Sequence, residues 1–254
     1  MEMIETKRIS KRFSTAVETY DQHAEAQRAI CQRLLSLLRG VTPLRFERVL
    51  EVGCGSGGFT RLLRVQGEVG EWWLNDLCES WSPALRALMI GQRWHWLPGN
   101  AEELSFDGSF DLIASANALQ WLHDLPGFLR RLSSRLRPDG HLLFNLFSPD
   151  NLFEIKQLTG QGLNYPEVEQ VRDWLKNDYQ LLRLEQERLT LTFPDPMEVL
   201  RHLKYTGVTA NASGVWTRGR QARFCADYRE RFSTPDGQVT LTYVPIYIVA
   251  TEKK

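Results

Sequence analysis

The chain reads RVLEVGCGSGGFTRLL over residues 48–63, and this stretch decides the fold that we expect. An apolar, β-branched run ending at Val52 predicts a short buried strand, the glycines after it predict a sharp turn, and the apolar spacing from Phe59 predicts a helix. Glycine lets the backbone approach a ligand closely, and a helix N-terminus adds unpaired N–H groups with a partial positive charge. The stretch therefore predicts a nucleotide-type cofactor site and leaves the cofactor open.

Two glycine patterns fit the same turn. Gly53, Gly55 and Gly58 match the G-x-G-x-x-G fingerprint of dinucleotide-binding domains. Glu51 with Gly53, Gly55 and Gly57 matches the acid-x-G-x-G-x-G pattern of S-adenosylmethionine enzymes. The glycines alone do not decide between these two cofactors.

Composition limits the classes of protein that the chain can belong to. Its 254 residues with 43% hydrophobic content suit one large domain, and the net charge of +0 gives no overall attraction to nucleic acid. No run of about eighteen apolar residues and no apolar signal core occurs, so we expect no membrane span. The four isolated cysteines suggest neither a metal site nor a disulfide framework and fit a reducing, cytoplasmic location.

Apolar periodicity predicts alternating strands and helices through the first 150 residues. Helical spacing covers an arm over residues 7–39, ahead of the first strand. Later strands are expected at residues 71–76, 94–97, 110–116 and 141–147, with a turn at 138–140 before the last of them. Such alternation predicts an α/β fold with a mostly parallel sheet and helices on both faces.

The pattern loosens after Phe147. Residues 179–193 carry strand-like alternation, residues 197–205 and 220–232 read as helices, and residues 206–219 have loop composition. Residues 239–250 predict a final strand that follows a hairpin-type turn and therefore runs antiparallel. Pro245 within it favours an edge position or a bulge.

Two further features lie where an open α/β sheet binds its ligands. Asp76 ends the second strand about twenty residues beyond the glycine turn, where a ribose-binding carboxylate is expected. Residues 117–121 follow the fourth strand, where the reacting centre is expected. Together with the arm, the glycine turn and the run Gly99-Asn100-Ala101-Glu102, they resemble the class I S-adenosylmethionine-dependent methyltransferases over nearly the whole chain.

The chain looks closest to the malonyl-acyl carrier protein O-methyltransferases of biotin synthesis. The residues that carry this closer resemblance are Phe13, Ala16, Tyr20 and Gln27 in the arm, the runs SANALQW at 115–121, TGVT at 206–209 and LTY at 241–243, and Trp216. The resemblance implies a Rossmann-like, seven-stranded, mostly parallel sheet with an antiparallel last strand. It also implies a helical arm (residues 1–45) and a methyltransferase domain (46–254) with a helical lid within residues 151–234.

The same resemblance implies S-adenosyl-L-methionine as cofactor and malonyl-acyl carrier protein as substrate and partner. Its cofactor-binding positions fall on Gln27, Glu51, Gly53, Gly55, Gly57, Asp76, Asn100, Ala101 and Asn117. Glu51 and the carbonyl of Gly53 would hold the methionine end, Asp76 both ribose hydroxyls, and Asn100 with Ala101 the adenine. The family usually has Asp before that alanine, so the uncharged Asn100 predicts a weaker hydrogen bond to the adenine amine.

The chemistry of the implied reaction needs positioning more than proton transfer. A malonyl carboxylate is ionised at neutral pH, so no general base is required, and orientation with water exclusion supplies much of the acceleration. The candidate catalytic residues are Tyr20, His23, Trp121, Arg201 and Lys204. Tyr20 and His23 share a helical face, Trp121 would wall the site, and Arg201 or Lys204 would anchor the malonyl carboxylate.

A basic segment lies near the expected lid. Residues 201–231 hold seven Arg or Lys against two acids, an excess that predicts steering of an acidic carrier protein. Three alternatives remain at this level: a methyltransferase for a free small carboxylic acid, an NAD-dependent oxidoreductase favoured only by the G-x-G-x-x-G match, and a catalytically silent cofactor-binding partner protein.

Overall fold

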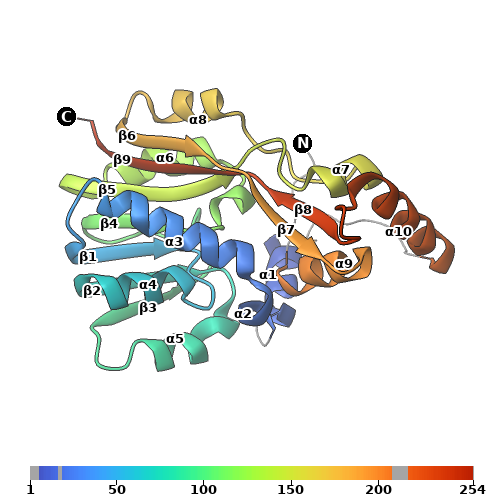
Figure 1. Ribbon diagram of the computed structural model, residues 1–254. Coiled ribbons are helices and arrows are strands. Elements are labelled where there is room, and N and C mark those ends of the chain that lie inside the picture. Colours follow the sequence, from blue (N-terminus) through green and yellow to red (C-terminus); the bar gives the residue numbers. More distant parts are fainter. Residues whose placement is uncertain (1–5, 17–18, 208–216, 254) are drawn as a thin grey trace.

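A seven-stranded sheet forms the centre of the protein, whose computed structural model describes residues 6–16, 19–207 and 217–253 (Figure 1). The strands are β1 (Arg45–Val52), β2 (Glu68–Asp76), β3 (Trp94–Pro98), β4 (Phe110–Ser115), β5 (Leu136–Phe147), β6 (Tyr179–Gln186), β7 (Leu189–Phe193), β8 (Val239–Tyr243) and β9 (Pro245–Glu252). The strand order in the large sheet is β3-β2-β1-β4-β5-β9-β6. β9 runs antiparallel to both of its neighbours, which confirms the mostly parallel sheet with an antiparallel last strand.

Helices cover the sheet on both faces. They are α1 (Thr6–Ala16), α2 (Tyr20–His23), α3 (Glu25–Arg39), α4 (Gly58–Gln66), α5 (Ser82–Leu88), α6 (Leu125–Ser133), α7 (Phe153–Thr159), α8 (Val168–Leu175), α9 (Pro196–Tyr205) and α10 (Arg218–Phe232), with short 3-10 turns η1 (Glu79–Trp81) and η2 (Leu119–Trp121). Figure 1 shows α3 crossing the face of the sheet that is turned toward the viewer.

Alternation along the strands divides the core in two. On β9, Tyr247 and Val249 join the cluster that contains the buried faces of α3 and α4, whereas Ile246 and Ile248 join the cluster that contains those of α6 and α8. Because successive strand residues point to opposite faces, one strand contributes to both clusters. A strand buried on both faces is apolar at nearly every position, as β9 is.

Strand-like alternation over residues 179–193 is confirmed by two strands, β6 and β7, which belong to different sheets. Two predictions about residues 239–250 are wrong in detail. These residues form two strands in different sheets, β8 and β9, rather than one final strand. Pro245 is the first residue of β9, which lies between β5 and β6 rather than at an edge. A strand accepts proline at its first position, where the missing N–H interrupts no ladder.

The turn expected at residues 138–140 lies inside β5. Phe110 of β4 pairs with Leu136, and Leu112 pairs with His141, so the intervening residues bulge out of the ladder. Asp139 has φ +64° there, a conformation that Asp tolerates better than most residues. The bulge preserves the pairing on both sides, and the strand therefore begins at Leu136 rather than at His141.

β7 and β8 pair in a second, two-stranded sheet that α7, α9 and α10 accompany. Figure 1 shows this region projecting beyond the end of the large sheet, with α10 at its tip. The fully buried Glu154 of α7 accepts hydrogen bonds from Thr242 N (3.1 Å) and Thr242 Oγ1 (2.7 Å), which fastens α7 to β8. None of the helices in the described ranges is long and apolar enough to cross a membrane. Val208, Thr209 and Trp216, which carried part of the resemblance, lie outside the described residues.

Candidate functional site

The glycine turn after β1 has left-handed backbone at three positions. Gly53, Gly55 and Gly57 have φ of +70°, +53° and +81°, a region that L side chains rarely adopt. A Cβ on Gly53 would lie 2.2 Å from Ala118 Cβ, so the turn packs directly against the segment after β4. A Cβ on Gly55 would meet nothing within 4 Å. The turn is therefore closed at Gly53 and open toward a pocket at Gly55, as a ligand cradle requires.

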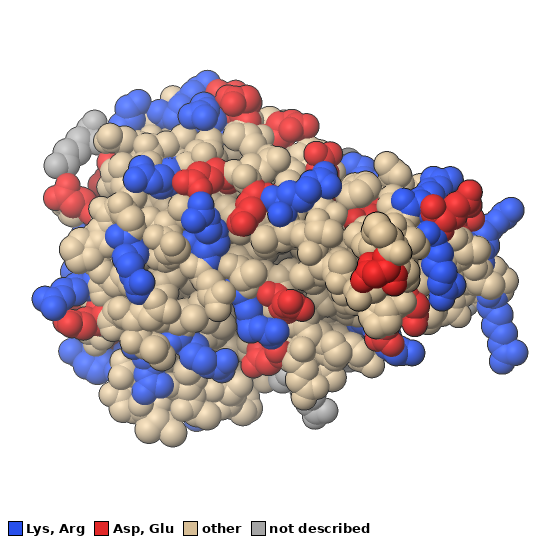
Figure 2. Space-filling model, in the orientation of Figure 1, with Lys and Arg blue, Asp and Glu red and all other residues tan. Residues whose placement is uncertain are grey.

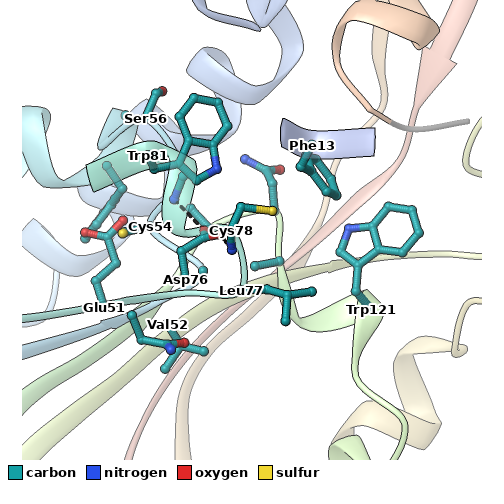
Figure 3. A pocket seen from close by; sticks show the side chains of 18 of the residues that line it. Phe13, Glu51, Val52, Cys54, Ser56, Asp76, Leu77, Cys78, Trp81 and Trp121 are labelled. Atoms are coloured by element: carbon teal, nitrogen blue, oxygen red, sulfur yellow. Dashed lines mark hydrogen bonds between the residues drawn. The ribbon is translucent and has the colours of Figure 1, made fainter. Parts of the chain in front are cut away.

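Asp76 at the end of β2 fastens this turn. Its Oδ2 accepts a hydrogen bond from Gly55 N and its Oδ1 accepts one from Cys78 N, each at 2.8 Å. Burial raises the pKa of this carboxyl to about 6, against the opposing effect of the two N–H donors. A carboxylate oxygen can accept more than one hydrogen bond, so Asp76 can still receive ligand hydroxyls. Figure 3 shows Asp76 next to Cys78 in the pocket.

Glu51 is an almost fully buried acid near the end of β1. Its Oε2 accepts a hydrogen bond of 2.5 Å from Thr60 Oγ1. Burial raises the pKa of Glu51 to about 8, and the nearby Asp76 raises it further, whereas the Thr60 bond opposes the shift. A buried carboxyl with a raised pKa and an acid beside it would bind a cationic group favourably.

The arm supplies a buried amide to the same pocket. Gln27 of α3 is 7% exposed, and its Oε1 has no hydrogen-bond partner among the residues that the structure describes. Asn117, after β4, has φ +59°. Its backbone N–H donates to Asn145 Oδ1 (2.8 Å), and its Nδ2 donates to the backbone carbonyl of Gln27 (3.5 Å). A buried acceptor without a donor is unfavourable unless a ligand supplies the donor.

A pocket of about 300 Å³ collects most of the predicted site residues. Those that line it are Tyr20, Gln27, Glu51, Gly53, Gly55, Asp76, Asn100, Ala101, Asn117 and Trp121. Gly57 does not line it and instead caps α4, where a Cβ would meet Leu88 at 2.4 Å. The pocket therefore brings together residues from the arm, the glycine turn and the carboxyl ends of β1, β2 and β4.

Three predicted catalytic residues lie outside the pocket lining. His23 stacks on Tyr205, with ring centroids 4.5 Å apart. Arg201 and Lys204 are exposed on α9, and Arg201 forms an ion pair with Glu198. The structure therefore brings Tyr20 and Trp121 to the pocket and places His23, Arg201 and Lys204 on the side of α9.

Two aromatic walls, Trp81 and Phe13, were not among the site residues predicted from the sequence, whereas Trp121 was. Trp81 lines the pocket and meets Tyr20 edge to face at 5.7 Å, and Phe13 of α1 meets Trp121 in the same way at 5.8 Å. Figure 3 shows Phe13 and Trp121 on one side of the pocket and Trp81 on another. The signal for Trp81 was its place five residues after Asp76, within the segment that follows a strand's carboxyl end.

The adenine-side prediction concerns a short turn after β3. Asn100 Oδ1 accepts from Glu102 N (3.1 Å) and its Nδ2 donates to Glu103 Oε1 (2.9 Å), while Ala101 is buried. The Asn100 side chain thus folds back on its own turn, as Asn commonly does. Within the described residues, no group of three or more His, Cys, Asp or Glu side chains could hold a metal ion.

Comparisons with known proteins agree with this geometry. A family model described as a methyltransferase domain matches residues 22–206. The malonyl-[acyl-carrier protein] O-methyltransferase of Porphyromonas gingivalis is 45% identical over 97% of this chain and 96% of its own length, and the one of Haemophilus influenzae is 39% identical over 97% and 95%. The N-methyltransferase NodS of Bradyrhizobium japonicum, solved with S-adenosyl-L-homocysteine, has a TM-score of 0.61 at 14% identity, covering 97% of this chain and all of NodS.

The fold and the matched family model place the chain among the methyltransferases. The full-length relatives then narrow the assignment: the chain belongs to the family of the malonyl-[acyl-carrier protein] O-methyltransferases. The NAD-dependent oxidoreductase reading of the glycine turn does not hold for a member of this family.

Proposed function

We propose that this protein uses S-adenosyl-L-methionine to esterify the free carboxylate of a malonyl group on acyl carrier protein, in biotin synthesis. The observation that carries the proposal is the pocket built on the glycine turn, with two buried acids at the ends of adjacent strands. Identity of 45% over nearly the full length to a protein named for that reaction supports the substrate class.

The residues of the pocket fit the cofactor. The unpartnered oxygen of Gln27 and the buried Glu51 offer acceptors to an ammonium group, Asp76 offers acceptors to ribose hydroxyls, and Gly55 leaves room for a close approach. Asn100 and Ala101 line the pocket where the adenine is expected. When bound, this cofactor supplies a methyl group on a sulfonium, which is already electrophilic.

The carboxylate that accepts the methyl group needs hydrogen-bond donors and exclusion of water rather than a general base. Burial raises the pKa of Tyr20 above its ordinary value, so its hydroxyl stays protonated at neutral pH and can donate a hydrogen bond to a carboxylate. Trp121 and Phe13 restrict water at the same pocket. Anchoring of the malonyl carboxylate by Arg201 or Lys204, and a role for His23, stay predictions.

The test incubates the protein with methyl-labelled S-adenosylmethionine and, in parallel, malonyl-acyl carrier protein, malonyl-coenzyme A and free malonate. We expect base-labile label on the carrier-bound acyl group and little on free malonate. Label on malonate alone would assign the chain to free-acid methylation. Absence of labelled product from all three acceptors, with cofactor still bound, would point to a silent binding protein.

A second prediction concerns the exposed arginines of α10. Figure 2 shows Lys and Arg side chains around the projecting end of the molecule that α10 forms. Arg223→Glu combined with Arg229→Glu is expected to lower kcat/KM for the malonyl carrier about tenfold at low salt, because charge steering acts on association, and to leave kcat unchanged.

The control for this prediction is Arg183→Glu, which reverses one charge at an exposed position on β6 and is compared with Arg223→Glu alone, because the double variant reverses two charges. Kinetics at low and at high ionic strength separate electrostatic steering of the carrier from a structural effect of the substitutions, because salt screens electrostatic steering. Equal kcat/KM for the α10 variant and the β6 variant at both salts would show that α10 does not meet the carrier.

A further inference from the structure

A chain of buried polar groups leads from the second sheet to the cofactor pocket. It begins at His202 of α9, passes through the hydroxyl of Tyr243 on β8, and ends at the amide of Gln27 on α3. The three side chains are 4%, 1% and 7% exposed. They come from positions up to 216 residues apart, so only the folded chain brings them together.

The direction of each hydrogen bond follows from His202. One ring nitrogen of His202 donates to the backbone carbonyl of His23, and Nε2 lies 2.8 Å from Tyr243 Oη. Burial, with His23 nearby, lowers the pKa of His202 to about 4, so the ring is neutral and carries one N–H. That N–H is committed to the carbonyl of His23, so Nε2 is an acceptor and the Tyr243 hydroxyl donates to it.

The Tyr243 hydroxyl has one proton, which it donates in its hydrogen bond to His202 Nε2. Its oxygen is then an acceptor toward its other partners, and the Gln27 side chain is one of them. An amide can meet an acceptor only through its NH₂ group. Gln27 therefore turns its nitrogen toward Tyr243 and leaves Oε1 as the group without a partner.

Gln27 and Glu51 both line the pocket, and two neighbouring residues connect them. Cys31, one helical turn after Gln27 on α3, lines the pocket, and its pKa is raised by burial and by Glu51. Asn117 contacts both α3 residues, since its Nδ2 lies 3.5 Å from the backbone carbonyl oxygen of Gln27 and 3.9 Å from Cys31 Sγ. Gln27 and Glu51 are therefore both acceptors on the pocket lining, with Cys31 near each of them.

We propose that Tyr243 and His202 are positioning residues, which hold the Gln27 amide so that its oxygen faces the ammonium group of the cofactor's methionine end. The inference rests on the proposed use of S-adenosylmethionine. It adds that residues of α9 and β8, outside the pocket lining, set affinity for the amino-acid part of the cofactor. Without Tyr243 the Gln27 amide is free to present its NH₂ group, a donor that repels an ammonium.

The test compares two ligands that differ at the methionine end. S-adenosylhomocysteine carries the ammonium group and 5′-methylthioadenosine lacks it, and calorimetry measures both affinities without turnover. Tyr243→Phe is expected to weaken S-adenosylhomocysteine binding about tenfold and to leave 5′-methylthioadenosine binding unchanged. His202→Leu should act in the same way, and His202→Gln should restore affinity, because its terminal amide oxygen accepts the Tyr243 proton.

A double-mutant cycle isolates the route through Gln27. If Tyr243 acts through Gln27, Tyr243→Phe has no further effect on S-adenosylhomocysteine affinity once Gln27→Leu is present. Equal weakening of both ligands by Tyr243→Phe, or additive effects in the cycle, would overturn the proposal. Should Tyr243→Phe fail to unfold cooperatively, the two His202 variants decide by the same readout. A wild-type protein that binds neither ligand would instead refute the proposed cofactor.

Discussion

Glu51→Gln is expected to weaken S-adenosylhomocysteine binding about a hundredfold while making the ligand-free protein more stable at pH 8. The affinity falls because a buried carboxylate facing an ammonium group becomes a neutral amide, and charged hydrogen bonds in dry surroundings contribute strongly. The stability rises because folding without ligand buries that carboxylate away from water, where the Thr60 hydroxyl donates one hydrogen bond to it.

The sign of the stability effect depends on pH. The pKa of Glu51 rises from an ordinary 4.5 to about 8 in the folded protein, so folding favours its protonated form. The penalty is absent below pH 4.5, grows as pH rises toward 8, and is complete above it. We therefore expect Glu51→Gln to leave stability nearly unchanged at pH 4.5 and to raise it by about 3 kcal/mol at pH 8.

Glu154→Gln is the matched control, because Glu154 is also fully buried but lies on α7, away from the pocket lining. Both of its oxygens accept hydrogen bonds from Thr242, one from the N–H and one from the hydroxyl, so an amide there loses one acceptor and the charge that strengthens both bonds. We expect lower stability and unchanged affinity for S-adenosylhomocysteine. Chemical unfolding at pH 4.5 and pH 8, with calorimetry at pH 8, measures both; a Glu51→Gln protein that is less stable than wild type at pH 8 would contradict the argument.

Local patterns predicted the elements that line the candidate pocket. The strand, turn and helix over residues 48–63 follow from β-branched residues, glycines and apolar spacing that act within a few positions. Asp76 was found because parallel strands bring their carboxyl ends to one edge, which makes its place a consequence of topology. Asn117, after β4, follows from the same reasoning, and all of these residues meet at the pocket or fasten it.

Contacts between distant segments were beyond reach of the same reasoning. Nothing near Tyr243 in the sequence shows that β8 pairs with β7 in a separate sheet, or that its hydroxyl lies 2.8 Å from His202 Nε2. Arg201 and Lys204 were chosen for charge, but α9 buries its apolar face and turns both basic groups outward. Periodicity gives a helix its buried stripe, and it does not say which partner covers that stripe.

Gly53→Ala is the other change with a large expected effect, because two independent penalties fall on one methyl group. The backbone has φ +70°, where an L residue is strained, and the new Cβ would lie 2.2 Å from Ala118 Cβ. Neither neighbour is the flexible end of a long side chain, so the turn or the segment after β4 must move. We expect a loss of about 3 kcal/mol in stability and no measurable binding of S-adenosylhomocysteine.

Two other glycines separate the effect of backbone strain from the effect of the close Cβ contact. Gly55 has φ +53° with nothing near a Cβ, so Gly55→Ala carries only the backbone strain and should lower stability by about 1 kcal/mol. Gly219 lies in α10 with ordinary φ and open space, so Gly219→Ala should be neutral or slightly stabilising. Thermal and chemical unfolding rank the three. Equal losses of stability in Gly53→Ala and Gly55→Ala would show that close packing of the turn on Ala118 is unimportant. A larger loss in Gly53→Ala would identify that contact as the reason why glycine is required directly after β1.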